Sequence, residues 1–279
     1  MLHNSNRLFQ RGSFMKVALI QFNAGADKAD NIRRAIDFVR RAIDRGARFI
    51  LLPEIYNFRG DTRNKAEIAK IAERIPGPSV LPFAALARRH KVHILIGSVF
   101  EKSAGTSKAY NTSILINAEG KPAAKYRKIH LFDARIGDKI ICESDCFLAG
   151  KSPALTAAAG FKTGLSVCYD LRFPEGYRHY CRQGAHILTV PSCFTKKTGQ
   201  AHWEILLRAR AVENLAYVLA PNQVGADYRG VEAYGNSMIV SPWGEVIARG
   251  SSNKEEVIYG EITMAEIEKA RAILPGIAR

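Results

Sequence analysis

The sequence predicts an α/β protein in which mixed sheets carry helices on their outer faces. Short apolar runs rich in β-branched residues alternate with amphipathic segments in the first and third quarters of the chain. This alternation indicates parallel neighbouring strands that are buried on both faces. About nine strands are expected, which is many for one open sheet, so two sheets packed together are favoured.

The expected strands share this apolar pattern, and they lie at 15–22, 47–54, 92–100, 111–120, 161–170, 185–192, 215–225, 236–248 and 257–263. Two regions, 111–128 and 236–250, read as antiparallel hairpins because each contains a Gly between its two strand-like halves.

The expected helices lie between these strands, at 31–46, 64–75, 78–91, 174–184, 201–214 and 264–274. The clearest is 31–46, in which apolar residues repeat at helical spacing and Gly46 supplies a C-terminal stop. Pro174 suits the first turn of its helix. We find no linker and no repeat, and therefore expect one domain over 15–279, preceded by a disordered extension over 1–14.

The formal net charge is +15. Such a balance suits nucleic acid, a membrane surface or an anionic small substrate. The basic residues are spread over many segments without a stripe of interleaved aromatics, so we expect no nucleic-acid partner. No apolar run approaches the length of a spanning helix, so we also expect no membrane partner.

The cysteines number five, an odd count without a repeating spacing. This pattern does not describe a disulfide framework and favours a reducing, cytoplasmic location. Cys142 and Cys146 lie four apart, but no matching Cys or His pair follows them, so a zinc site is not predicted. We expect no metal and no cofactor.

Cys168 follows a small-apolar run, "GLSVC", and precedes a helix that begins near Pro174. A strand, a sharp turn and a helix expose such a side chain at the carboxyl end of the sheet and leave a backbone N–H, that of Tyr169, for an oxyanion. The alternative is an isolated buried thiol that packs as a small hydrophobe. A nucleophilic thiol needs a base or a positive charge beside it. His130 is the best placed histidine, but no histidine has a decisive context.

Glu54 ends the apolar run "FILLPE" in the same way, and a partly desolvated carboxylate there could accept the thiol proton. Alternatively, it forms a loop salt bridge. Lys128 follows a hairpin strand, and alternation places it on the opposite face from Arg127. An inward Lys128 would pair with Glu54 and stabilise an oxyanion, whereas an outward one would belong to a solvated basic edge.

These three stretches together resemble the nitrilase superfamily, the carbon–nitrogen hydrolases that use a Glu-Lys-Cys set. The similarity covers nearly all of Met15 to Pro275, and it rests on "LLPEIY", "KYRKIHLFD" and "GLSVCYDLRFPE", supported by "ICESD", "PSCFTKKTGQAHWEILLRARAVEN" and "YGNSMIVSPWGEV". Within that superfamily the chain is similar to the Nit-type amidases, most of all deaminated glutathione amidase. The resemblance implies an αββα sandwich of two mixed sheets flanked by helices, and a homodimer or higher homo-oligomer.

Carried over by motif, the resemblance makes Glu54 the base, Cys168 the nucleophile and Lys128 the oxyanion partner. Glu143 in "ICESD" matches a second glutamate beside the site. For substrate binding we name Arg172 as a carboxylate clamp, with Tyr56 and Phe194 lining the pocket. Pairing of Arg172 with Glu175 or Asp170, and core packing of the two aromatic rings, are equally consistent with the residues.

The activity implied by the resemblance is hydrolysis of a non-peptide amide bond through a thioester, with release of ammonia from a small anionic amide. Deaminated glutathione or a related ω-amide of a keto or dicarboxylic acid is the expected substrate. Hydrolysis of an N-carbamoyl amino acid or a nitrile is the alternative on the same fold. A catalytically silent scaffold subunit is the non-enzymatic alternative.

Overall fold

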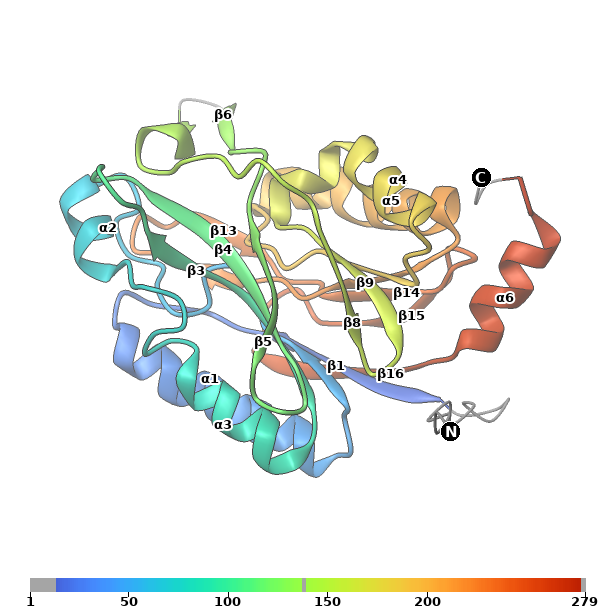
Figure 1. The fold of residues 1–279 in the computed structure, drawn as a ribbon. Helices are drawn as coiled ribbons and strands as arrows, with labels where there is room; N and C mark the ends of the chain where they lie inside the picture. The colour runs from blue at the N-terminus through green and yellow to red at the C-terminus, as the bar shows by residue number, and fades with distance from the viewer. Residues whose placement is uncertain (1–13, 137–138, 277–279) are drawn as a thin grey trace.

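Two six-stranded mixed sheets lie face to face in a computed structural model that describes residues 14–136 and 139–276 (Figure 1). The first sheet has the order β16 (Glu256–Ile262), β1 (Met15–Gln21), β2 (Phe49–Leu51), β3 (His93–Lys102), β4 (Ala109–Ile116), β5 (Pro122–Arg127). The second has the order β15 (Val246–Arg249), β14 (Met238–Val240), β11 (Tyr217–Ala220), β10 (Ile187–Thr189), β9 (Phe161–Leu165), β8 (Ala154–Ala158). The expected extension at 1–14 lies outside the described residues except for Phe14.

Each sheet has three parallel strands at its centre and antiparallel strands at its edges. In the first sheet β1, β2 and β3 are parallel, and in the second β9, β10 and β11 are parallel. Both hairpins predicted from glycine positions are present, as β4–β5 and β14–β15. The parallel and antiparallel pairings therefore agree with the sequence patterns.

Helices cover the outer face of each sheet (Figure 1). The helices are α1 (Lys28–Asp44), α2 (Lys65–Ile71), α3 (Leu81–His90), α4 (Pro174–Arg182), α5 (Lys196–Asn214) and α6 (Met264–Ile273). Helices α1 and α3 pack on the first sheet, and α4 and α5 on the second. The chain thus forms the predicted αββα layers.

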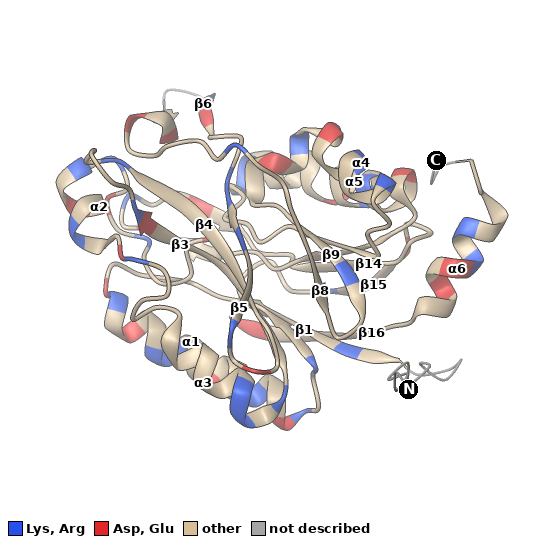
Figure 2. Ribbon diagram, viewed as in Figure 1, with Lys and Arg blue, Asp and Glu red and all other residues tan. Residues whose placement is uncertain are grey.

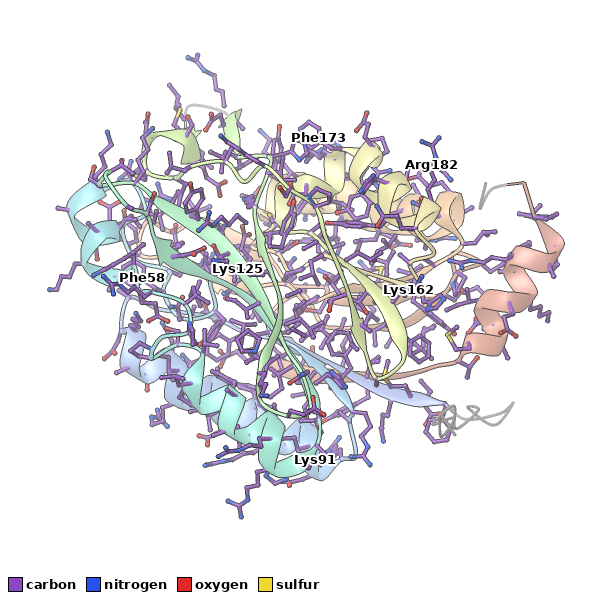
Figure 3. The ribbon with its side chains drawn as sticks, viewed as in Figure 1. Phe58, Lys91, Lys125, Lys162, Phe173 and Arg182 are labelled. Carbon is purple, nitrogen blue, oxygen red and sulfur yellow. The ribbon has the colours of Figure 1, made fainter. Side chains whose placement is uncertain are left out.

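Alternation along β1 shows why both faces of the first sheet are buried. Val17 and Leu19 face the second sheet, whereas Ala18 and Ile20 pack with α1 and α3. All four side chains have no exposed surface. Figure 3 shows side chains filling the space between the sheets and beneath the helices.

Helix α1 begins where a side chain caps it. The Asp27 carboxylate accepts hydrogen bonds from the Ala29 and Asp30 backbone N–H groups at 2.9 and 3.0 Å. Helix α5 begins at Lys196, five residues before the start predicted from its apolar pattern.

Some elements were not predicted from the sequence. They are the hairpin of β6 (Asp133–Ile136) with β7 (Lys139–Cys142), the strand β13 (Glu232–Tyr234), the edge strand β8, and the 3-10 turns η1 (Glu143–Asp145) and η2 (Cys168–Arg172). The strand expected at 215–225 is divided into β11 and β12 (Val224–Ala226), and β12 pairs with β13. Charged residues interrupt β6 and β7, and β8 is rich in alanine, so neither carries a strand-like apolar run.

Basic residues are distributed over many elements (Figure 2). They occur on α1, α3, β5 and α5, as the sequence indicated. No described helix combines the length and the hydropathy that crossing a bilayer requires.

Candidate active site

Glu54 follows the carboxyl end of β2, a central strand of the first sheet, where the chain turns away from the strand. A close approach between chain segments makes this turn possible. A Cβ atom added at Gly97 of β3 would lie 2.1 Å from the carbonyl oxygens of both Leu52 and Pro53. Ile55 then adopts a left-handed conformation with φ of 47°. Glycine at position 97 therefore lets the segment that carries Glu54 pack directly on β3.

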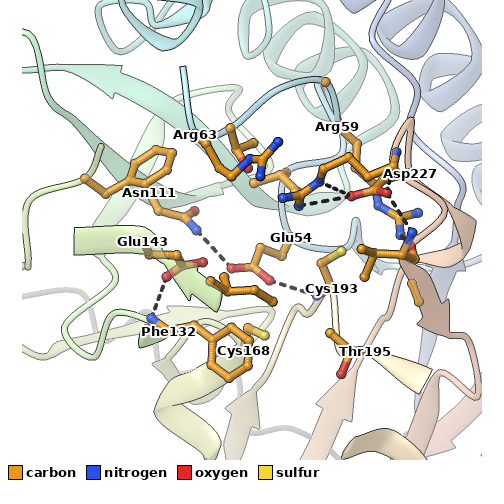
Figure 4. A pocket seen from close by; sticks show the side chains of 18 of the residues that line it. Glu54, Arg59, Arg63, Asn111, Phe132, Glu143, Cys168, Cys193, Thr195 and Asp227 are labelled. Carbon is orange, nitrogen blue, oxygen red and sulfur yellow. Dashed lines mark hydrogen bonds and ion pairs between the residues drawn. The ribbon is translucent and has the colours of Figure 1, made fainter. Parts of the chain in front are cut away.

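The Glu54 side chain is 4% exposed and is held by donors from both sheets (Figure 4). Its Oε1 atom accepts hydrogen bonds from Lys128 Nζ at 3.0 Å and Asn111 Nδ2 at 2.9 Å. Its Oε2 atom accepts the backbone N–H of Cys193 at 2.8 Å, and its backbone carbonyl accepts Gln223 Nε2 at 2.8 Å. These contacts hold the carboxylate in one orientation.

Lys128 and Arg127 lie on opposite faces, as strand alternation predicted, and of the two arrangements left open the structure has Lys128 inward. Lys128 is 1% exposed, and its ammonium contacts Glu54 and both carboxylate oxygens of Glu143, the latter at 3.0 and 2.8 Å. Burial lowers the pKa of Lys128, but the charges of Glu143, Glu54 and Cys168 outweigh burial and raise it well above the ordinary value. Lys128 is therefore a permanent cation inside the protein.

Glu143 lies in η1, between β7 and β8, and reaches the same ammonium from the other side. Its Oε2 atom also accepts the backbone N–H of Phe132 at 2.8 Å. Burial and the nearby Glu54 charge raise the pKa of Glu143 although Lys128 opposes them. One cation is thus shared by two carboxyl groups.

Cys168 opens η2, just beyond the carboxyl end of β9, with a left-handed φ of 49°. Its own N–H donates to the Pro191 carbonyl at 2.9 Å, whereas the Tyr169 N–H has no acceptor among the described residues. Burial and the charge of Glu54 raise the pKa of the Cys168 thiol well above its ordinary value, and Lys128 opposes this. The group is a thiol at neutral pH and needs a base to become a nucleophile.

Asp170 fixes the turn that carries Cys168. Its Oδ2 atom accepts hydrogen bonds from the Tyr126 hydroxyl at 2.8 Å and the Val167 N–H at 2.9 Å. Its Oδ1 atom accepts the His130 backbone N–H at 2.9 Å and contacts His130 Nδ1 at 2.8 Å. The His130 ring stacks on Phe173, with centroids 3.6 Å apart. His130 therefore supports the turn through Asp170 and Phe173.

A cavity of about 110 Å³, here called the inner pocket, opens beside these groups and is lined by Glu54, Asn111, Phe132, Glu143, Cys168, Cys193 and residues of the neighbouring loops. In Figure 4 the Cys168 sulfur lies on one side of Glu54, and Arg59 and Arg63 lie on the other. The Arg59 guanidinium has a structural role, because it donates hydrogen bonds to the carbonyls of Val224, Gly225 and Val231.

The three proposed substrate-binding side chains do not line the inner pocket. Tyr56 is fully buried against Phe83, with its hydroxyl on the Ser79 carbonyl. Phe194 packs on Trp203 with ring centroids 5.0 Å apart.

Arg172 lies over the outside of the same region. Its Nη2 atom is 3.3 Å from His202 Nδ1, and its guanidinium lies over the Tyr169 and Phe194 rings at 5.8 and 5.4 Å. The burial of Tyr56 and Phe194 agrees with the core packing that the sequence left open for both rings, and a substrate-binding role for Arg172 stays a prediction.

Residues that sequence reasoning missed include Asn111, Arg63 and Arg229. Asn111 donates to Glu54 from inside β4, and Arg63 and Arg229 lie on the wall of the inner pocket. Asn111 could have been found from its position, because it lies two residues before Ser113 and four before Leu115 and so shares the inward face of a largely apolar strand. The two arginines lie in loops, where the sequence carries no directional signal.

Comparison with known proteins identifies the family. The family model described as carbon-nitrogen hydrolase matches residues 16–272. The chain belongs to the carbon-nitrogen hydrolase family. The match includes every residue of the set formed by Glu54, Lys128, Glu143 and Cys168.

Relatives of this carbon-nitrogen hydrolase are of the Nit type. It is 36% identical over 261 residues to the omega-amidase NIT2 of Homo sapiens, covering 93% of this chain and 92% of the relative. It is 37% identical over 268 residues to a deaminated glutathione amidase of Synechocystis sp. (strain PCC 6803 / GT-S), covering 93% and 96%. The crystal structure of Saccharomyces cerevisiae Nit3 superposes with a TM-score of 0.84 at 32% identity, covering 94% of this chain and 95% of that one. These matches confirm the predicted fold and family branch.

Within residues 14–136 and 139–276, no group of three or more His, Cys, Asp or Glu side chains has an arrangement suited to a metal ion. The polar set beside the inner pocket consists of a thiol, two carboxyl groups and one ammonium, which is a composition suited to proton transfer and covalent catalysis.

Proposed function

We propose that this carbon-nitrogen hydrolase cleaves the amide bond of a small 2-oxo acid amide, with Cys168 as the nucleophile. The observation that carries the proposal is the buried ammonium of Lys128, held between Glu54 and Glu143 beside the pocket that Cys168 lines. A thiol with a raised pKa, a carboxylate and a fixed cation together supply a nucleophile, a base and charge stabilisation.

In the first half-reaction, Glu54 takes the proton of the Cys168 thiol while sulfur attacks the amide carbon. The C=O electron pair moves to oxygen, and Lys128 and the Tyr169 N–H stabilise the resulting oxyanion. Collapse of this intermediate breaks the C–N bond. Protonated Glu54 gives its proton to the departing amine, and a thioester on Cys168 remains.

In the second half-reaction, Glu54 accepts a proton from water as the water attacks the thioester. Collapse of the second tetrahedral intermediate breaks the C–S bond, releases the carboxylic acid and returns the proton to sulfur. Glu143 orients the Lys128 ammonium throughout. Because the four groups interact strongly, their titrations belong to the set and not to single residues.

The substrate class follows from the names of the relatives, an omega-amidase and a deaminated glutathione amidase. The two reactions differ in the leaving group. A primary ω-amide such as α-ketoglutaramate releases ammonia, as expected from the sequence. Deaminated glutathione is a secondary amide, so its hydrolysis releases cysteinylglycine, and the expected release of ammonia is wrong for that substrate.

The alternatives have less support. N-carbamoyl and nitrile hydrolysis fit the same thiol chemistry, but the relatives named above are amidases. A silent scaffold subunit would not need the four interacting groups, all of which are present.

The same proposal includes a homodimer and a cytoplasmic location. Ile205 and Val212 of α5 and Trp243 before β15 are 70%, 43% and 48% exposed, an apolar surface of the kind found at subunit contacts. All five cysteines are unpaired thiols, which suits a reducing compartment.

The test compares wild type with Cys168→Ala on deaminated glutathione, α-ketoglutaramate, an N-carbamoyl amino acid and an aliphatic nitrile. Cysteinylglycine, ammonia and carbon dioxide are measured as the products. We expect hydrolysis of one or both 2-oxo acid amides, abolished in Cys168→Ala and retained in Cys142→Ala, which removes another thiol of the inner pocket. Activity that survives in Cys168→Ala would refute the assignment of the nucleophile.

A further inference from the structure

A second, wider cavity adjoins the inner pocket. This outer pocket has a volume of about 790 Å³. Both cavities are lined by Arg63, Ile141, Thr195, Arg229, Val231 and Glu232. A substrate whose reacting carbon lies at Cys168 can therefore extend into the outer pocket without leaving the protein surface.

The outer pocket is lined by four basic side chains, those of Arg63, Lys196, Lys197 and Arg229, and by one acidic side chain, Glu232. Lys196 pairs with Glu232 at 2.7 Å. This pair leaves an excess of positive charge on the wall.

The remaining cations differ in how fully they are neutralised. Arg229 Nη2 is 3.2 Å from Asp227. The Arg63 side chain is 59% exposed; its Nε atom lies 3.5 Å from Asp61, and its guanidinium also interacts with the Tyr228 hydroxyl. Lys197 is exposed and has no ion pair or hydrogen bond within the described part of the chain. Lys197 and Arg63 are thus the cations with most capacity to bind an added anion.

The helix that carries Lys197 adds to this charge. Lys196 and Lys197 form the first turn of α5, which contains no acidic residue and lacks a side-chain cap. Cations are disfavoured at a helix N-terminus, where the backbone dipole is already positive. A carboxylate bound there would offset both the positive end of the helix dipole and the charge of the two lysines.

We infer that the outer pocket binds a carboxylate on the amine side of the substrate, with Lys197 and Arg63 as the residues that select it. The inference rests on the proposed amide hydrolysis and specifies its substrate class. The preferred substrate is a secondary amide of a 2-oxo acid whose leaving amine is a short peptide with a free carboxyl end. A primary amide such as α-ketoglutaramate leaves the outer pocket empty.

The test measures kcat/KM for deaminated glutathione, for its C-terminal carboxamide and for α-ketoglutaramate. The enzymes are wild type, Lys197→Gln, Arg63→Gln and the control Arg182→Gln, which removes an exposed cation from α4. Wild type should prefer deaminated glutathione to its carboxamide by about tenfold, the value of one hydrogen bond between charged groups. That preference should fall to near unity in Lys197→Gln, fall in Arg63→Gln and persist in Arg182→Gln. The change should appear mainly in KM.

Two outcomes distinguish a failure of the outer-pocket inference from a failure of the proposed function. If wild type hydrolyses the amides but prefers neither form, or if Lys197→Gln and Arg63→Gln keep the wild-type preference, the outer-pocket inference is wrong and the proposed function stands. If wild type hydrolyses no amide, the proposed function fails. Calorimetric titration of Cys168→Ala then decides the inference: it requires the free carboxylate form to bind about tenfold more tightly than the carboxamide, and equal affinity overturns it.

Discussion

At the scale of single residues, the charge balance around Lys128 links stability to catalysis. The Lys128 ammonium is fully buried and contacts Glu54 and Glu143, so neither carboxyl group is left without a cation. Removing one member of a buried ionic set leaves uncompensated charge in a poorly solvated place, which costs more than the lost attraction alone.

We predict that Lys128→Met lowers the free energy of unfolding by about 3–5 kcal/mol and lowers kcat/KM by about 10²- to 10³-fold. Urea denaturation and steady-state kinetics measure the two effects. The control Lys121→Met removes an exposed cation from the turn that precedes β5 and should change neither quantity. Adding Glu143→Gln to Lys128→Met should restore part of the stability without the activity. A fully stable Lys128→Met would contradict the buried ionic set.

At the scale of elements, the position of Glu54 depends on how closely the end of β2 approaches β3. Gly97 permits this approach, because a Cβ atom there would overlap two carbonyl oxygens. Backbone atoms on both sides leave no flexible side chain that could move aside.

Gly97→Ala should therefore displace the segment that carries Glu54 and lower both stability, by about 2–4 kcal/mol, and kcat. Gly176→Ala is the matched control, because Gly176 lies in α4 with open space around its Cβ position. That control should gain about 0.5–1 kcal/mol of stability, as expected for alanine in a helix. Thermal unfolding and kcat for both variants test this. Wild-type kcat in Gly97→Ala would show that Glu54 does not depend on the approach.

The edge of the first sheet carries a second ionic cluster, in which Glu101 of β3 contacts Lys125 and Arg127 of β5. Burial acts to raise the pKa of Glu101, but hydrogen bonds from Arg127, Lys125 and Thr112 outweigh it and lower the pKa to about 2. Because the folded pKa lies below the ordinary value of 4.5, this carboxylate stabilises the protein fully above pH 4.5. That contribution disappears as the pH falls toward 2.

Glu101→Gln should therefore lower the free energy of unfolding by about 1–2 kcal/mol at pH 7. This value is reduced because the basic partners of Glu101 are partly exposed. The difference between variant and wild type should shrink at pH 3, where wild type has lost part of the same contribution. Urea unfolding at the two pH values measures it. A difference that grows on acidification would rule out this origin.

Most of these elements and most of the site residues could be predicted from the sequence, and the physical basis of the prediction differs from residue to residue. Glu54 and Cys168 end apolar strands, where the change in hydrophobicity is visible in the sequence. Alternation could separate Lys128 from Arg127, but it could not decide which of the two side chains points inward. Tyr56 could not be placed, because the left-handed conformation of Ile55 rotates the chain and directs the ring into the core. No propensity specifies such a conformation for isoleucine.

The β6–β7 hairpin illustrates the other limit. It brings Ile141 and Cys142 to the inner pocket and precedes Glu143, yet its charged residues interrupt any strand pattern. Its two strands pair with each other, and hydrogen bonds from Phe132 N–H to Glu143 and from Ser144 N–H to Asp133 tie its ends together, none of which the apolar pattern reveals. The outer pocket was missed for the same reason, since its wall combines loop residues with the first turn of α5.

At the scale of the whole molecule, the exposed apolar surface of α5 points to self-association. Val212 lies close to Gly244, and Arg208 donates to the Gly244 carbonyl at 2.8 Å. This connects α5 to the turn that holds Trp243. Ile205, Val212 and Trp243 thus belong to neighbouring segments of the same subunit.

We predict a homodimer that buries these side chains. Sedimentation equilibrium should give about twice the mass of the chain for wild type, and Ile205→Glu combined with Trp243→Glu should give the monomer mass. The control Ile140→Glu places the same change on an exposed apolar residue of β7. A monomeric wild type, or a dimer unaffected by the double change, would assign this surface another role.

The arrangement of donors around Glu54 has a consequence for how activity is acquired. Asn111 and Lys128 come from the first sheet and its hairpin, whereas the Cys193 N–H and the Gln223 amide follow strands of the second. A chain that has formed only one sheet can supply only half of this coordination. During refolding, catalytic turnover would therefore return with the docking of the two sheets and lag behind the recovery of secondary structure, so that enzyme activity reports the last assembly step of the monomer.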